Sequence, residues 1–138
     1  MRWSALIPFA LALSCFGCQS QAQRLDEANQ SIESIRATTT TAANAWLSGT
    51  VSDRFAHAAI ERAYELSEQT RTSLAASPTS MADSRAAAAT ADCEHLSRVL
   101  ARLGDAIERG DRAAAHTALA DIGAPARRSA RTDGEVTP

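Results

Sequence analysis

Three histidines and one cysteine are the side chains in the body of this chain best suited to binding a metal ion: His57, His95, His116 and Cys93. Cys93 and His95 are two residues apart, so in a helix they point to different faces. The sequence contains no His-x-x-x-His or Glu-x-x-His pair, the local spacing that di-metal helical bundles use. We therefore expect neither a metal site nor a cofactor.

Cys93 has two interpretations. It falls in a row of apolar residues at helical spacing, where it would serve as a small buried hydrophobic residue. The alternative is a disulfide between two copies of the chain, since an odd cysteine in an oxidising compartment has no partner within its own chain.

Motifs for catalysis are missing from the sequence. Cys15-Phe16-Gly17-Cys18 is followed by Gln19 and not by the histidine that haem attachment needs. There is no glycine-rich phosphate loop and no Gly-x-Ser-x-Gly elbow. A row of charges includes Glu61, Arg62, Glu65, Glu68 and Arg71, and such alternation is typical of a solvated helix face. We expect no catalytic residue and no enzyme activity.

The first seventeen residues have the layout of an export signal. Met1-Arg2-Trp3 supplies one positive charge, and the apolar run from Ala5 to Gly17 follows. That run is shorter than the ~20 residues that a membrane-spanning helix needs. A charged start followed by a short apolar stretch indicates a secretory signal at residues 1–17.

The end of this run, Cys15-Phe16-Gly17-Cys18, resembles the lipobox of bacterial lipoproteins. The resemblance implies that Cys18 carries a diacylglycerol and becomes the new N-terminus, with residues 18–23 as the acylated cysteine and a short linker. Gly17 fits the pattern, whereas Cys15 stands where leucine is usual and Phe16 where a small residue is usual. Gln19 after the cysteine would imply the outer membrane, with the body of the protein facing the periplasm.

Two other processing sites are open. Cys15 follows Leu13-Ser14 and is a second candidate for acylation, although Leu13 is bulky. Ordinary cleavage after Ala22 is the third, because Ser20 and Ala22 are small residues at the required spacing. That cleavage would release a soluble periplasmic protein.

Composition favours a single helical domain. The chain has 138 residues and a net charge of −2, and all 14 of its basic residues are arginine, so a nucleic-acid partner is not expected. Alanine, the strongest helix former, is frequent. Beyond the signal only Trp46, Phe55 and Tyr64 are aromatic, so the core must pack through small side chains.

Apolar residues recur in steps of three and four, and this spacing predicts helices at about 24–47, 52–77, 80–107 and 111–122. The predicted buried rows are, in chain order, Leu25, Ala28, Ile32, Ile35, Thr39, Ala42 and Trp46; Phe55, Ala59, Ala63, Leu66, Thr70 and Leu74; Ala82, Ala86, Ala89, Cys93, Leu96, Leu100 and Leu103; and Ala115, Ala118, Leu119 and Ile122.

Short turns between long helices favour antiparallel neighbours. We expect an all-α fold, an antiparallel bundle of three long helices and one short C-terminal helix with an alanine-rich seam, spanning residues 24–123. Residues 124–138 have no apolar pattern and are predicted to be a disordered tail. An extended hairpin that completes its core by dimerising is the alternative.

These features together predict a non-enzymatic envelope lipoprotein that acts as a structural or protein-interaction module. Its expected partners are membrane lipid, through the acyl group on Cys18, and either another envelope protein or a second copy of the chain. It is similar to the small murein lipoproteins only in being acylated and helical, since their wall attachment uses a C-terminal lysine and this chain has none. The alternative is a soluble or tethered periplasmic bundle that binds a small ligand or a metal.

Overall fold

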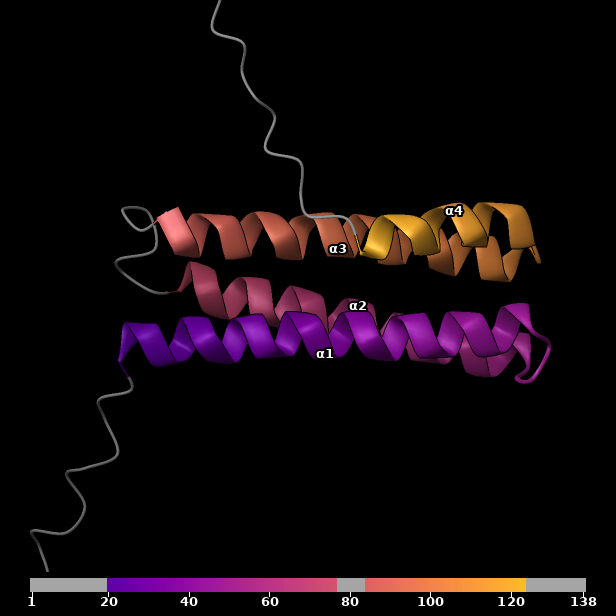
Figure 1. Ribbon diagram of the computed structural model, residues 1–138, viewed down its shortest axis with the longest axis horizontal. Coiled ribbons are helices and arrows are strands. Elements are labelled where there is room, and N and C mark those ends of the chain that lie inside the picture. Colours follow the sequence, from indigo (N-terminus) through magenta and orange to yellow (C-terminus); the bar gives the residue numbers. More distant parts are fainter. Residues whose placement is uncertain (1–19, 77–83, 124–138) are drawn as a thin grey trace, which may run out of the picture.

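The computed structural model describes residues 20–76 and 84–123, which form four helices and no strand (Figure 1). The helices are α1 (Gln21–Leu47), α2 (Asp53–Ala75), α3 (Ser84–Glu108) and α4 (Arg112–Ile122). The expected all-α fold of three long helices and one shorter C-terminal helix is confirmed. The predicted signal, Cys18 and the predicted tail lie outside the described residues.

The helices run up and down along one axis, each antiparallel to the next (Figure 1). α2 packs against both α1 and α3, and α4 folds back along α3 while also touching α1. Because α4 has 11 residues and α1 has 27, the fourth helix lies along only part of the bundle. The core draws on all four helices of one chain, which is the expected bundle and not an open hairpin.

Side-chain caps begin three of the helices. The hydroxyl of Ser52 accepts a hydrogen bond from the amide of Phe55, and the Asp111 carboxylate accepts one from Ala114. At α1 the cap is Ser20, whose hydroxyl accepts from the Gln23 amide at 3.3 Å. The helix therefore starts at Gln21 and not near Arg24 as predicted, because a serine in extended conformation was available to cap it earlier.

The turn between α1 and α2 and the turn between α3 and α4 each contain a glycine in a left-handed conformation. Gly49 between α1 and α2 has a φ of 76°, and Gly110 between α3 and α4 has a φ of 64°. Residues with a Cβ rarely adopt this left-handed conformation. The two glycines let both helix pairs reverse direction within a few residues.

The buried rows predicted for α1 and α3 are confirmed wherever the structure describes them. All seven residues chosen on α1 are buried, and Ala43 is buried beside them. On α3 the six chosen residues from Ala86 to Leu103 are buried, and Ala82 lies outside the described residues. On α4, Ala115, Ala118 and Ile122 are buried and Leu119 is partly buried. Many of these residues are alanines, so the alanine-rich seam is also confirmed.

The row predicted for α2 is correct at Ala63 and Leu74 and wrong at Phe55, and its other members, Ala59, Leu66 and Thr70, are only partly buried. Phe55 and Tyr64 are 59% and 41% exposed. The residues that α2 buries are Ala56, Ile60, Ala63, Ser67 and Leu74. The prediction followed the large aromatic ring, whereas α2 lies between α1 and α3 and fits there through small side chains at Ala56, Ala63 and Ser67. Of the three aromatic residues beyond the predicted signal, only Trp46 lies in the core, at 2% exposure.

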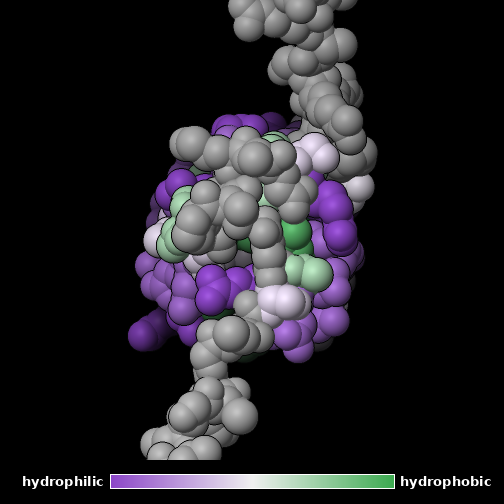
Figure 2. Space-filling view, turned by 90° about the vertical axis from the view of Figure 1, so that its left-hand side faces the viewer, coloured by the Kyte–Doolittle hydropathy of each residue, from purple (hydrophilic) through white to green (hydrophobic). Residues whose placement is uncertain are grey.

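Figure 2 shows the molecule from the end where α1 begins and α2 ends. Hydrophilic residues cover most of the coloured surface, and hydrophobic residues are visible toward the middle of this face. The arrangement is that of helices with one apolar side turned inward.

Candidate functional site

A shallow, open groove lies between α2 and α3, with a volume of about 310 Å³. Its lining is polar and carries both signs of charge. The residues that line it are Tyr64, Glu68 and Arg71 from α2 and Glu94, Ser97, Arg98 and Ala101 from α3.

The floor of the groove is a chain of hydrogen bonds that enters the core. Ser97 donates its hydroxyl to Oε1 of Glu68 at 2.7 Å, a charge-assisted bond. The Ser97 proton is thereby used, so its oxygen is free to accept from the hydroxyl of Ser67, 3.0 Å away. The Ser67 hydroxyl also lies 3.2 Å from the carbonyl oxygen of Cys93, so it can donate to that oxygen instead of to Ser97. Two buried serines therefore tie α2 to α3 without leaving a hydroxyl unpaired.

Glu68 and Arg71 form the charged part of this network. Nε and Nη2 of Arg71 donate to Oε2 of Glu68 at 3.0 and 2.7 Å. The hydrogen bond from Arg71, and after it the one from Ser97, holds the pKa of the Glu68 carboxyl below its usual value. The same contact raises the pKa of Arg71. Both residues stay charged at neutral pH.

The side chains at the rim of the groove make fewer contacts than those at its floor. Tyr64, Glu94 and Arg98 are exposed and make no hydrogen bond or ion pair to another described residue. They offer a phenol, a carboxylate and a guanidinium around one hollow, a set that suits a small molecule carrying both charges. The groove has no histidine in its lining, and the serine hydroxyls beneath it are hydrogen-bonded.

The sequence interpretation of the charged row on α2 is confirmed only in part. Arg62 and Glu65 pair at 2.9 Å with side chains 66% and 58% exposed, as expected of a solvated face. Glu68 and Arg71 are only partly exposed and are joined to the core by Ser97. The sequence feature that could have indicated this network is the pair Ser67 and Ser97, two polar residues among the buried residues of facing helices.

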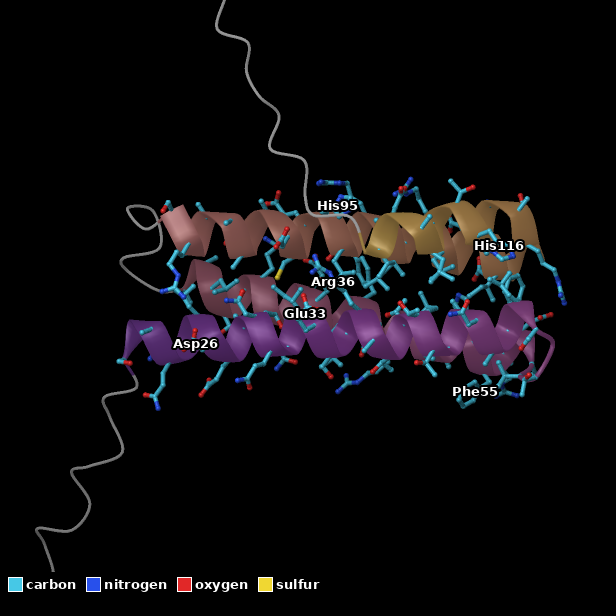
Figure 3. All side chains as sticks on the ribbon, in the orientation of Figure 1. Asp26, Glu33, Arg36, Phe55, His95 and His116 are labelled. Atoms are coloured by element: carbon cyan, nitrogen blue, oxygen red, sulfur yellow. The ribbon has the colours of Figure 1, made fainter. Side chains whose placement is uncertain are left out.

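The structure keeps the three histidines apart. His57 on α2 pairs with Glu108 at 3.0 Å, and Nε2 of His95 on α3 lies 3.2 Å from the carbonyl oxygen of Asp121. His116 is exposed on α4, and Figure 3 shows it well away from His95 along the bundle. Across residues 20–76 and 84–123, no three His, Cys, Asp or Glu side chains come together in a way that could hold a metal ion.

Cys93 is a buried core residue, as the first interpretation predicted. Its exposure is 0%, and it is a free thiol. Burial raises the pKa of this thiol to about 11, so it is protonated at neutral pH. A disulfide between two chains would require α3 to turn this side chain out of the core.

The predicted acylation site, Cys18, and the alternative at Cys15 lie outside the described residues, whereas the third predicted site, cleavage after Ala22, falls in the first turn of α1. Among the helices in the described part of the chain, none is both long and apolar enough to cross a bilayer. Comparisons of the chain with protein-family models, with curated proteins and with solved structures found no match.

Proposed function

We propose that this protein is a non-enzymatic envelope lipoprotein, held through an acyl group on Cys18, whose helical bundle acts as a structural or protein-interaction module. The observation that supports this most directly is the start of α1 at Gln21, capped by Ser20. Only Gln19 and Ser20 separate Cys18 from the helix. An acyl chain on Cys18 would hold the bundle against the membrane with almost no tether.

This anchor would give the bundle a defined direction. α1 has 27 residues and is about 40 Å long at 1.5 Å per residue. The turn after Leu47 therefore lies at the end far from Cys18, and Phe55 is near this turn with 59% of its surface exposed (Figure 3). Aromatic residues are over-represented where proteins bind one another. Phe55 is thus the residue we assign to contact with an envelope partner, and Gln19 favours the outer membrane as the location.

The anchor is tested by the intact mass of the protein extracted from membranes of its native host. We expect a chain that starts at Cys18 and carries acyl mass, and we expect Cys18→Ser to abolish acylation. Cys15→Ser is the matched control and should leave the added mass in place. A chain that starts at Gln23 without added mass would refute the anchor and leave a soluble periplasmic bundle.

The interaction role is tested by placing a photo-crosslinking residue at position 55 in the native host. We expect capture of a single envelope protein from position 55. The same residue at Asn29, exposed on the half of α1 nearer Cys18, should capture that protein far less. Equal capture from both positions, or none from either, would contradict a role for the distal end.

The groove between α2 and α3 favours a second candidate function, the binding of a small molecule with both a positive and a negative group. Arg98 and Glu94 would take its opposite charges and Tyr64 its apolar part. A set of amino acids and amino sugars, screened by thermal unfolding, tests this. A ligand that raises the melting temperature of the wild type but not of Arg98→Gln would favour it. Arg109→Gln, also exposed on the α3 side, is the control.

A further inference from the structure

Arg36 on α1 presents two polar atoms that are buried and unpaired. Its Nη1 donates to Glu33 at 2.8 Å, and its side chain is only 18% exposed. Nε and Nη2 are shielded from solvent and have no hydrogen-bond partner. These two atoms form one edge of the guanidinium, the fork that binds both oxygens of a carboxylate. Arg71 uses the same edge on Glu68.

Thr39, one helical turn further along the same face, is in a similar state. It is 1% exposed, and its hydroxyl has no partner. Other threonines on these helices behave differently. Thr41, Thr70, Thr72, Thr90 and Thr117 each donate to the carbonyl four residues earlier. A buried hydroxyl and a buried fork without partners are each costly, and native proteins seldom leave such groups unpaired.

The two residues lie where α4 stops covering α1. Arg112 at the start of α4 donates to the carbonyl of Leu47, so the start of α4 lies beside the end of α1. Counting back along both helices from this bond places Ile122, the last residue of α4, at about the level of Arg36. Figure 3 shows the Arg36 side chain reaching from α1 toward α3 at this level. Its charge also acts on Cys93 of α3.

We infer that the unpaired edge of Arg36, together with the hydroxyl of Thr39, is a binding site for a carboxylate. The Nε and Nη2 atoms would donate to its two oxygens, and Thr39 would donate to one of them. A singly charged group suits the site because one guanidinium, already shared with Glu33, faces a largely apolar interior. A doubly charged phosphate would leave a charge uncompensated there. This site is separate from the groove between α2 and α3 and does not depend on the anchor at Cys18.

The test is a titration of the ¹⁵N-labelled full chain with sodium acetate, followed at the arginine Nε–H signals with sodium chloride holding the ionic strength constant. We expect the Arg36 signal, identified by its loss in Arg36→Lys, to shift in a saturable way. Arg62 is the internal control because it pairs with Glu65 at the same spacing but is 66% exposed. Its signal should not saturate. An Arg36 signal that does not saturate with acetate, either in the wild type or in the variant Asp133→Asn, Glu135→Gln, and that the double variant does not move, would overturn the proposal.

Thr39→Val keeps the shape of the side chain and removes the hydroxyl. We expect it to remain folded and to weaken acetate binding by about tenfold, the worth of one hydrogen bond to a charged group. Unchanged acetate affinity in folded Thr39→Val would contradict the site as described.

A carboxylate could come from a separate molecule or from this chain, which has Asp133 and Glu135 near its end. The combined variant Asp133→Asn, Glu135→Gln distinguishes the sources. If the Arg36 signal starts at its bound position and the double variant releases it, the chain supplies its own carboxylate. If the double variant changes nothing and acetate still saturates the shift, the ligand is a separate molecule. Both results support a carboxylate site.

Discussion

The guanidinium carbon of Arg112 lies 5.6 Å from the centroid of the Trp46 ring. The same arginine donates from Nη1 to the carbonyl of Leu47 at 2.9 Å, and Trp46 donates from Nε1 to Oδ1 of Asp53 at 2.6 Å. Trp46 is therefore held on one side by the start of α2 and on the other by the start of α4. These contacts join three helices at the end of the bundle where α1 ends and α2 and α4 begin.

Arg112→Gln should destabilise the bundle. The substitution removes a cation–π contact and a hydrogen bond to a carbonyl at the end of α1, and we expect a loss of about 1 kcal/mol in the free energy of unfolding. Urea denaturation measures it. Arg109→Gln is the control, because the side chain of Arg109 has no hydrogen bond or ion pair with the described residues. Equal losses in both variants would show that the contact with Trp46 contributes nothing.

Cys93 should make stability fall at high pH. The folded thiol has a pKa of about 11, whereas an unfolded cysteine loses its proton near 8.5 to 9. Below pH 8 both states keep the proton and the thiol has no effect on pH dependence. As the pH rises from about 9 to 11, only the unfolded state is deprotonated, so the free energy of unfolding falls by about 1.4 kcal/mol per pH unit.

The difference in unfolding free energy between wild type and Cys93→Ala isolates this effect, since all other titrating groups are shared. We expect the difference to decline across pH 9 to 11 and to be flat between pH 6 and 8. The thiol should also resist alkylation at pH 8 until the protein unfolds. Rapid alkylation of the folded chain, or a dimer on non-reducing electrophoresis, would favour the disulfide alternative.

Two glycine substitutions should change stability in opposite directions. Gly104 lies inside α3, and a Cβ there would meet Cγ2 of Ile60 at 3.8 Å, an ordinary contact. Gly104→Ala should raise the free energy of unfolding by about 0.5 to 1 kcal/mol, because the unfolded chain loses freedom. Gly110 has a φ of 64°, so Gly110→Ala should lower it by about 1 kcal/mol. Thermal unfolding of both variants checks the signs, and a stabilising Gly110→Ala would contradict the strained turn.

Glu68 should contribute stability that is lost in acid. Its folded pKa is lowered by Arg71 and Ser97, so the ionised form is favoured in the folded state. The contribution is present above the unfolded pKa of about 4.5 and disappears as the pH falls through the lower folded value. Wild type should therefore lose more stability than Glu68→Gln between pH 6 and pH 3.

Glu65→Gln is the matched control for this acid titration, because Glu65 pairs with Arg62 at the same spacing on the exposed side of α2. Its acid profile should stay close to that of the wild type. A Glu68→Gln variant with an unchanged acid profile would show that the network under the groove does not stabilise the ionised carboxylate.

The sequence by itself determined the class of fold and the inward faces of α1 and α3. In both helices most of the large apolar residues recur in steps of three and four, so the 3.6-residue repeat gathers them on one face, as for Ile32 and Ile35. The turns were equally readable because Gly49, Gly110 and Asp111 have strong local preferences. Local residue preferences and periodicity are properties of a short stretch of chain, so they can be read without knowing which helices pack against it.

The tertiary structure alone decided which face of α2 is buried and which polar groups come together. Phe55 and Ala56 are adjacent, and hydrophobicity favours burying the ring. Packing between two helices instead buries Ala56, on the face of α2 that also carries Ile60 and Ala63, and leaves the Phe55 ring outside. Ser67 and Ser97 are 30 residues apart, so their hydrogen bond depends on how α2 and α3 meet. The unpaired fork of Arg36 likewise arises only from what surrounds it, and no spacing within α1 could have revealed it.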